Sequence, residues 1–446
     1  MKAEAPINSF VRRYYESGIS RFHMPGHKGK TLHGLEALDI TEINGADYLY
    51  EAEGIIAASE AAASEIFGTG KTLYSTEGSS LSIKTMLALT CRRRSLGRIK
   101  IIAPRNVHRA FINGCILLDI DPVWVYPSSA SVSVCGCPVT PEDIEKALAK
   151  EPEAAAVYIT SPDYLGNLAD IKGISRVCRR CGVPLLTDNA HGAYLKFLSP
   201  SLHPIDLGAD MCCDSAHKTL PVYTGGSCLH ISSSAPEVFA RYAKSEMSLF
   251  ASTSPSYLIM GSLDSCLEEL RGSLPERIRQ CCKRTRLAKE RLTALGWEVN
   301  GGEPMKLTVF PGSCGYSGQA LAELMRAYRI ECEYSDPSSI VFMPSPFNSE
   351  EDFQRLESAF AEIPHKAAAS SPVQVFPVAK AAMSLRTAYF SDSEELSTDE
   401  AAGRICARSA LSCQPSIPLI TGGEIFTPEI INILKNYSIF TVNVVK

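Results

Sequence analysis

Two stretches decide the fold: Val183-Pro-Leu-Leu-Thr-Asp-Asn-Ala-His-Gly192 and Asp214-Ser-Ala-His-Lys-Thr219. In the first, a short apolar run predicts a strand that ends at Asp188. The second follows another short apolar run and carries Lys218. Because such runs alternate with helical patterns from about residue 55 to 235, the sequence predicts an α/β fold with a mostly parallel sheet and helices on both faces.

Reactive side chains follow the carboxyl ends of several predicted strands. Asp188 and Lys218 follow two of them, and His108 follows a strand predicted over residues 99–103. In open α/β sheets ligands bind at that edge, so we expect the three side chains to converge on one site. Further strands are predicted over residues 154–160 and, as an antiparallel return, over residues 226–231.

Lys218 is the candidate for covalent cofactor chemistry. A lysine amine can hold an aldehyde cofactor as a Schiff base, and a lysine directly after a histidine, three residues beyond a serine, is a known setting for pyridoxal phosphate. The alternative is a solvated surface lysine. Asp188 favours the cofactor, because a carboxylate there would keep the pyridine nitrogen protonated and let the ring accept electrons. Alone, Asp188 would be an ordinary turn residue.

A phosphate cradle is predicted in Tyr74-Ser-Thr-Glu-Gly-Ser-Ser-Leu81, which precedes a helical pattern. Gly78 permits a close backbone approach, Ser79 and Ser80 offer hydroxyls, and the helix N-terminus favours an anion. The alternative is an ordinary serine N-cap. The run is not a P-loop, since the Gly-Lys-Ser/Thr element is missing.

The catalytic residues are therefore expected to be Lys218, Asp188 and His108, whose ring could stack on the pyridine. A surface histidine is the alternative for His108, and a plain Ser/Pro turn is the alternative for the loop at residues 252–257. The remaining cofactor contacts are expected from Ala190 beside the ring, His191 at the phenolic oxygen or the substrate, Ser215 and His217 on the phosphate side, and Ser252 and Thr253 reaching a phosphate from a neighbouring subunit.

The bulk composition excludes several classes of protein. The chain has 446 residues, of which 45% are hydrophobic and 21% charged, as in an ordinary globular protein of two or three domains. Its net charge of −5 gives no basic surface for nucleic acid. No apolar stretch is long enough to span a membrane, and the N-terminus lacks the apolar core of a signal peptide, so a cytoplasmic location is expected.

No metal site and no disulfide framework are expected. The sixteen cysteines lie in a long chain without a signal, which favours reduced, buried thiols. Cys178-Arg-Arg-Cys181 has metal or redox spacing but lacks a second pair. His23 and His27 also have metal-site spacing, but the Pro-Gly pair between them breaks the helix that such a site needs.

The sequence pattern changes along the chain and predicts four parts. A charged amphipathic helix is expected over about residues 266–296, further helices over 319–329 and 350–360, and another over 398–411. An Ala/Ser/Pro segment at 367–372 is expected to be a linker. The predicted parts are an N-terminal arm (1–30), a large pyridoxal-phosphate-binding domain (31–265), a small α+β domain (266–366) and a C-terminal domain (373–446).

Short segments in order along nearly the whole chain carry a family resemblance: 22–28, 39–43, 53–56, 104–108, 188–192, 215–221, 254–258, 261–264, 335–337 and 417–424. They resemble the bacterial ornithine/lysine/arginine decarboxylases of the aspartate-aminotransferase fold, in the shorter Gram-positive form. The resemblance implies a PLP-dependent transferase-like domain of fold type I with a mostly parallel, seven-stranded sheet. It also implies pyridoxal 5′-phosphate and a homodimer or larger homo-oligomer with active sites at the interface.

The resemblance implies decarboxylation of a small-molecule substrate, arginine, lysine or ornithine, to an amine and CO2. The C-terminal part departs from the family pattern. Arg408 stands where the family has a glutamate, and Cys413, Gln414 and Ser416 stand where it has Tyr, Pro and Gly. A pocket for a distal cation needs carboxylates, so Arg408 would repel a basic substrate if the missing glutamate served that pocket.

Other functions therefore stay open. One is the same cofactor with another reaction, as in an aminotransferase or a decarboxylase of a non-basic amino acid. The other is a family member that has lost activity and acts as a regulatory subunit.

Overall fold

The computed structural model describes residues 5–93, 98–127, 133–368, 378–411 and 416–446. The strands of its main sheet are β1 (Lys71–Ser75), β2 (Ile99–Pro104), β3 (Ile120–Val125), β4 (Ala156–Thr160), β5 (Leu185–Asp188), β6 (Met211–Asp214) and β7 (Ser227–Ile231). Their order is β1-β7-β6-β5-β4-β2-β3. The pairs β2/β3, β2/β4 and β5/β6 are parallel, whereas β7 is antiparallel to β1 and β6. The predicted α/β fold and the antiparallel return are confirmed.

Two strands of this sheet, β1 and β3, were not predicted from the sequence. β3 contains Asp121 and Pro122, residue types that are rare in strands. It can form a strand because it lies at the edge of the sheet. Proline has no N–H to donate, and at an edge no second neighbouring strand requires that donor. In β1 the polar residue Thr72 is fully buried, and its hydroxyl lies 2.9 Å from Nδ1 of His230, a partner that local patterning cannot reveal.

The chain divides into two compact units. The first consists of residues 5–93 and 184–277 and contains β1, β5, β6 and β7. Its helices are α1 (Pro6–Glu16), η1 (Leu49–Glu51), α2 (Ile55–Phe67), α3 (Gly78–Arg93), η2 (Ala193–Phe197), α7 (Ala216–Thr219), α8 (Glu237–Ser248) and α9 (Tyr257–Arg271).

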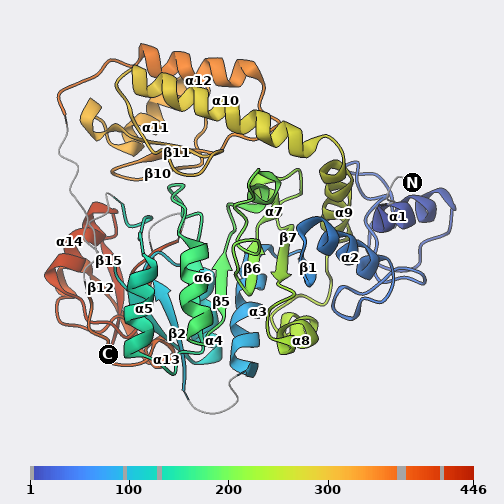
Figure 1. The fold of residues 1–446 in the computed structure, drawn as a ribbon, viewed down its shortest axis with the longest axis horizontal. Helices are drawn as coiled ribbons and strands as arrows, with labels where there is room; N and C mark the ends of the chain where they lie inside the picture. The colour runs from blue at the N-terminus through green and yellow to red at the C-terminus, as the bar shows by residue number, and fades with distance from the viewer. Residues whose placement is uncertain (1–4, 94–97, 128–132, 369–377, 412–415) are drawn as a thin grey trace. The chain divides into compact units, whose positions relative to one another are not determined.

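Helix α3 lies next to α8 in the first unit (Figure 1). It packs against β6, β7 and α8, and most of its residues are buried. Two of its buried hydroxyls are satisfied within the helix, since Thr85 and Thr90 each donate to the carbonyl four residues earlier at 2.9 Å. Burial on several sides holds α3 in place, and with it the N-terminal turn at Gly78.

The second unit consists of the described residues within 96–183 and 278–446. Beside β2, β3 and β4 it contains β8 (Glu298–Val299), β9 (Leu307–Phe310), β10 (Tyr334–Ser335), β11 (Ile340–Phe342), β12 (Ser393–Ser397), β13 (Ala410–Leu411), β14 (Pro418–Ile420) and β15 (Thr441–Val445). The helices are α4 (Arg109–Leu118), α5 (Pro141–Lys150), α6 (Ile171–Arg180), η3 (Pro311–Cys314), α11 (Gly318–Ala327), α12 (Glu350–Glu362), α13 (Leu385–Phe390), η4 (Thr398–Glu400) and α14 (Pro428–Asn436).

A four-stranded sheet, in the order β10-β11-β9-β8, has its own core in the second unit. The long helix α10 (Leu274–Ala294) contributes Ala288 and Leu292 to that core. Trp297 is 1% exposed and donates its indole N–H to the carbonyl of Phe360 in α12 at 3.0 Å. Figure 1 shows α10, α11 and α12 with β10 and β11, and the predicted helices near residues 319–329 and 350–360 are confirmed.

The helix predicted over 266–296 has the wrong bounds, and the one predicted over 398–411 is wrong. The helix expected over 266–296 is two helices, α9 and α10, separated at Gly272. The helix expected over 398–411 is only the short η4, because Gly403 has a φ of +78° and donates its N–H to the carbonyl of Phe426. Backbone pairing with distant segments thus replaces helical hydrogen bonds there. The larger part of the predicted linker, from residue 369, and the departures Cys413 and Gln414 lie outside the described residues.

Among the helices of the described residues, none combines the length and apolar character needed to cross a lipid bilayer. The division into four predicted parts stays a prediction.

Candidate cofactor site

Lys218 lies on the short helix α7, directly after β6. Its side-chain Nζ is 3.0 Å from Nε2 of His191, in the turn after β5. β5 and β6 are parallel neighbours, with Asp188 opposite Cys213. The pairing brings the turn after Asp188 next to the segment that carries Lys218. The sequence predicted that Asp188 and Lys218 would lie at the same edge of the sheet.

Asp188 ends β5 and is 3% exposed. Its Oδ1 accepts the backbone N–H of Ala190 at 3.1 Å and the thiol of Cys213 at 3.5 Å. Burial and the neighbouring Asp188 charge raise the pKa of Cys213, so that this thiol stays protonated and donates. The carboxylate is therefore held in one orientation by the turn that it begins, and Ala190 is buried beside it.

The predicted phosphate cradle lies at the start of α3 in the same unit. Gly78 has a φ of +67°, and a Cβ added there would meet no atom within 4 Å. Its N–H donates to the carbonyl of Gly225 at 2.8 Å. Ser215 donates its hydroxyl to that of Ser79 at 2.9 Å, which links the cradle to the segment carrying Lys218. Ser80 is half-buried on the first turn of α3, where N–H groups have no partner within the helix.

The remaining predicted contacts of this unit surround these groups. His217 is half-buried, and its Nδ1 lies 2.9 Å from the carbonyl oxygen of Gly226. Ser252 and Thr253 are exposed, but the Ser252 N–H donates to the Glu77 carboxylate at 2.7 Å, directly before the cradle. All predicted site residues other than His108 thus belong to the first unit.

The residues of the first unit fit pyridoxal phosphate. An amine, a buried carboxylate and a hydroxyl-lined helix N-terminus are the donor and acceptor types that its aldehyde, ring nitrogen and phosphate require. The unfilled space at the Cβ position of Gly78 leaves room for an anion beside α3. In addition, the Thr219 hydroxyl is buried and has no hydrogen-bond partner among the described residues. Sequence reasoning did not identify Thr219.

His108 lies in the second unit, where it caps α4. Its Nδ1 accepts the backbone N–H of Ala110 at 3.1 Å, and the ring is half-buried. The loop that carries it also contains Arg105, whose guanidinium binds both carboxylate oxygens of Glu424 at 2.8 and 2.7 Å. Both side chains are at most 3% exposed. This buried ion pair joins residues 319 positions apart, and no local signal could have predicted it.

The two family departures that the structure describes lie in the second unit. Arg408 is exposed, and its guanidinium carbon is 5.6 Å from the ring centroid of Tyr389. Ser416 has a φ of +61°, the left-handed region that favours glycine. The backbone at residue 416 therefore keeps the conformation suited to the glycine of the family pattern, even though a serine stands there.

The histidines of the predicted loop at 22–28 make separate hydrogen bonds. Nε2 of His23 lies 2.6 Å from the Tyr14 hydroxyl, and Nε2 of His27 lies 3.2 Å from Asp39 Oδ2.

Sequence reasoning missed a cluster in the first unit, formed by the buried side chains of His203, Asp214 and His230.

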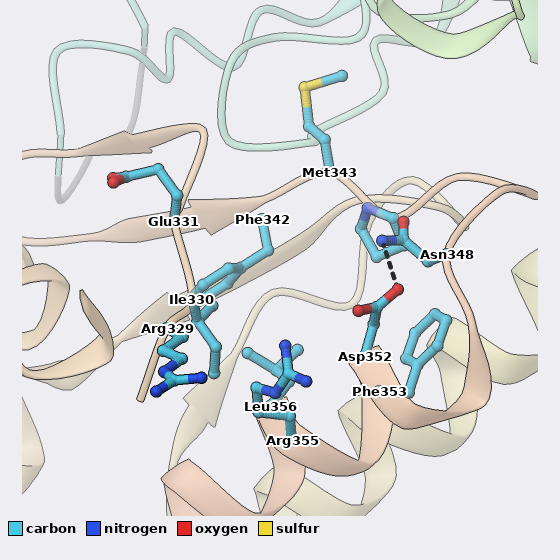
Figure 2. Close-up of a pocket in the computed structure, with 11 residues that line it drawn as sticks. Arg329, Ile330, Glu331, Phe342, Met343, Asn348, Asp352, Phe353, Arg355 and Leu356 are labelled. Carbon is cyan, nitrogen blue, oxygen red and sulfur yellow. Dashed lines mark hydrogen bonds between the residues drawn. The ribbon is translucent and has the colours of Figure 1, made fainter. Parts of the chain in front are cut away.

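The second unit contains a hollow of about 220 Å³ that includes none of the predicted site residues. Figure 2 shows the apolar side chains of Phe342 and Leu356 in its wall, with Arg329 and Arg355 near them. Asp352 also lies in the wall. Its carboxylate takes part in the capping box at the start of α12, where it accepts the Ser349 N–H at 2.8 Å. The hollow therefore lies beside β11 and α12, and none of its lining residues belongs to the candidate cofactor site.

Comparisons with known proteins identify the family and the fold of the chain. Residues 5–309 match the family model of the Orn/Lys/Arg decarboxylase major domain. An arginine decarboxylase of Bacillus subtilis is 29% identical over 97% of this chain and 94% of its own length. A lysine decarboxylase structure from Francisella novicida superposes with a TM-score of 0.84 at 16% identity, over 99% of this chain and 81% of the other.

A more distant fold relative is a structure of SPT with PLP. It has a TM-score of 0.54 at 14% identity, over 68% of this chain and 74% of the other. The predicted resemblance and the predicted fold class are both confirmed.

Proposed function

The chain belongs to the Orn/Lys/Arg decarboxylase family, and from that premise we propose that it is a pyridoxal-phosphate-dependent decarboxylase of arginine, lysine or ornithine. The observation that carries the proposal is the 3.0 Å contact between Lys218 Nζ and His191 Nε2, which joins the turns after two parallel strands. An amine so placed beside an imidazole can exchange a proton, as the reaction requires.

Each part of the cofactor has a partner of the right chemistry in this proposal. Lys218 would hold the aldehyde carbon, and Asp188 would hold a proton at the ring nitrogen. Ser79, Ser80 and Ser215 would bind the phosphate, with His217, Ser252 and Thr253 on the same side. Ala190 and His191 would contact the ring and its phenolic oxygen, and His108 would stack on the ring face.

When bound, pyridoxal phosphate accepts the electron pair that remains on the substrate α-carbon after CO2 leaves. The chain's own residues handle the protons. His191 Nε2 can accept a proton from Lys218 Nζ and return it, so the lysine can act as base and then as acid. A proton delivered to the α-carbon balances the reaction, since the substrate carboxylate leaves as neutral CO2. Burial of Asp188 keeps water away from its carboxylate, which strengthens its hold on a ring proton.

One observation favours a second candidate function, a pyridoxal-phosphate enzyme acting on a non-basic amino acid. Arg408 replaces a carboxylate that could pair with the distal cation of a basic substrate. An aminotransferase reaction and an inactive regulatory chain are further outcomes of the same tests.

The proposal includes a cytoplasmic homodimer or larger homo-oligomer. Support for self-association comes from large apolar side chains exposed in the first unit, among them Phe22 at 95% and Leu32 at 76%. A partner chain that covered these side chains would gain the free energy of removing them from water. The molar mass of the purified chain, measured by light scattering, tests this part, and a monomer at micromolar concentration would contradict it.

The activity test incubates the holoenzyme with a panel of amino acids and follows CO2, amine and keto acid separately. We expect CO2 and amine from a basic amino acid. Keto acid without CO2 would identify an aminotransferase, and turnover of a non-basic amino acid alone would support the second candidate. Protein that stays colourless with added pyridoxal phosphate would support the inactive alternative.

The cofactor link is tested by borohydride reduction. We expect reduction to attach the cofactor to the peptide that contains Lys218, and we expect no attachment in Lys218→Ala. Attachment at the same peptide in Lys218→Ala would overturn the assignment of Lys218.

A further inference from the structure

The carboxylate of Asp214 is the centre of a buried hydrogen-bond cluster in the first unit. Asp214 ends β6, four residues before Lys218, and is fully buried. Its Oδ2 lies 3.1 Å from Nε2 of His203 and 3.2 Å from Nε2 of His230. Its Oδ1 accepts the side-chain N–H of Asn189 at 2.7 Å. Oδ1 also accepts the Cys212 thiol at 3.5 Å. Both carboxylate oxygens are therefore used, Oδ2 by the imidazoles and Oδ1 by the amide and the thiol.

The cluster keeps Asp214 ionised. Burial by itself raises the pKa of Asp214, but His203 and His230 outweigh burial and lower this pKa far below its usual value. Hydrogen bonds to an ionised carboxylate are shorter and stronger than bonds between neutral groups. The 2.7 Å bond from Asn189 has the length of such a bond.

Asn189 connects this charge to the turn that carries His191. Asn189 follows Asp188, and its backbone N–H donates to the carbonyl of Cys213 at 3.0 Å. Its own carbonyl accepts the N–H of Gly192 at 2.8 Å, which closes the turn around His191. A Cβ at Gly192 would lie 2.0 Å from Asn189 Oδ1, so the turn packs tightly on this amide.

Asp214 is also linked to the phosphate side of the site, through its own backbone carbonyl and through the next residue in the chain. The backbone carbonyl of Asp214 accepts the hydroxyl of Ser227 at 2.7 Å. The next residue, Ser215, donates to Ser79 in the cradle. Asp214 thus joins three parts of the site: the turn after β5, the Lys218 segment and the start of β7.

We infer that Asp214 is a positioning residue, which holds His191 against Lys218 through its bond to Asn189. The inference rests on the proposed function only where it gives Lys218 and His191 a role in catalysis. The hydrogen bonds themselves do not depend on that function. His203, Asp214 and His230 also have the side-chain types of a transition-metal site, and their ligand atoms lie within 4.8 Å of one another. The hydrogen bonds already satisfy the Asp214 carboxylate, which favours a hydrogen-bonded cluster over a metal centre. The test below distinguishes the two.

Asp214→Asn is the decisive substitution. An amide has one acceptor oxygen and one N–H2 group. With its oxygen toward the imidazoles, the new amide would turn its N–H2 group toward the N–H2 group of Asn189. With its oxygen toward Asn189, both imidazoles would have to change to the tautomer that accepts at Nε2. Asn189→Ala removes the same link from the other end and tests the idea if Asp214→Asn does not fold. Asp206→Asn is the matched control, since Asp206 is a carboxylate of the same unit that pairs with Lys196 at 2.7 Å and makes no bond to Asn189.

The readout is the rate at which the Lys218 amine of the full-length protein without cofactor reacts with a dilute acylating reagent, followed by peptide mass spectrometry. Lys218 is half-buried, and its contact with His191 Nε2 engages the amine, which hinders attack on the reagent. We expect labelling of Lys218 to become about threefold to tenfold faster in Asp214→Asn and in Asn189→Ala. The double variant should show no further gain, because both changes break one link. Asp206→Asn should label like the wild type.

Each other outcome overturns the inference. Unchanged Lys218 labelling in folded Asp214→Asn, with only a lower melting temperature, would show that Asp214 stabilises the fold without positioning the lysine. Additive effects in the double variant would separate Asp214 from Asn189. One equivalent of zinc in the purified chain, lost in His203→Gln, would show a metal centre instead. Failure of the proposed function appears separately, as a wild-type protein that binds no pyridoxal phosphate while the labelling result stands.

Discussion

Nζ of Lys218 lies 3.0 Å from Nε2 of His191, although 27 residues separate them in the chain. The contact exists because β5 and β6 are parallel neighbours whose following turns meet at one edge of the sheet. It places a titratable ring next to the amine on which the proposed chemistry depends.

His191→Phe should therefore slow the proposed reaction more than it weakens cofactor binding. The substitution keeps a ring of similar size and removes the proton acceptor, so we expect kcat to fall by roughly 100-fold. Steady-state kinetics on the preferred substrate measure this. His33→Phe, at an exposed histidine, is the control. A higher KM with unchanged kcat would mean that His191 serves substrate binding alone.

Gly78→Ala should weaken pyridoxal phosphate binding by about tenfold. The new methyl group would occupy the space beside the start of α3, and the residue would also adopt a strained φ of +67°. Gly18→Ala is a close control, because Gly18 has the same φ of +67° and equally open surroundings. Fluorescence titration with the cofactor measures the affinity. Equal losses in the two variants would mean that backbone strain, and not filling of the cradle, causes the effect.

Arg408→Glu should increase kcat/KM for a basic amino acid. The change restores the carboxylate of the family pattern and removes a positive charge, so a substrate with a distal cation gains an attraction. Arg408→Gln separates the two causes, because it only removes the charge. Kinetics with arginine, lysine and ornithine check the prediction. No change in either variant would mean that residue 408 does not contact the substrate.

Arg105→Met should destabilise the second unit by about 3–5 kcal/mol, because it leaves the buried Glu424 carboxylate without its bidentate partner. Both tryptophans, Trp124 and Trp297, lie in this unit, so urea unfolding followed by tryptophan fluorescence reports on it.

The matched control for that experiment is Arg404→Met. Arg404 pairs with Glu394 at 2.8 Å, but both side chains are more than a third exposed, so a loss of at most about 1 kcal/mol is expected. Replacing both Arg105 and Glu424 by methionine should cost less than Arg105→Met alone. Similar losses in Arg105→Met and Arg404→Met would contradict the role given to burial.

The loop at residues 32–36 should lose protection in acid. Desolvation raises the pKa of Glu36, but backbone N–H groups, including those of Leu32, His33 and Gly34, outweigh it and lower this pKa to about 2. A lowered carboxyl pKa gives stability that is present above the ordinary value of 4.5 and is lost as the pH falls toward 2. Hydrogen exchange of residues 32–36 between pH 5 and 2.5 measures this.

Glu36→Gln is the control for the acid effect. Its protection should be lower than that of the wild type at pH 5 and should not change over the same interval. Exchange of α3 in the same samples detects any general unfolding. Constant protection of residues 32–36 in the wild type would refute the link to Glu36.

The sequence by itself determined the class of fold, the strand ends that carry Asp188 and Lys218, and the presence of a helix beside the serine-rich run at residues 74–81; that the helix begins at Gly78 came from the structure. These features depend on local apolar runs and turn residues, which a single pass along the chain detects. The same local patterns failed at residues 398–411, where Gly403 and pairing with Phe426 prevented a helix. They also failed for β1 and β3, whose polar residues and proline are tolerated only because of their places in the sheet.

The tertiary structure alone decided which side chains meet. Lys218 with His191, Asp214 with His203, His230 and Asn189, and Arg105 with Glu424 are contacts between segments far apart in the chain. Each depends on how strands pair and on which groups lose water together, since a buried charge persists only where a distant partner offsets its desolvation. Local residue patterns place a lysine at the end of a strand, but only the packed sheet places a histidine 3.0 Å from its amine.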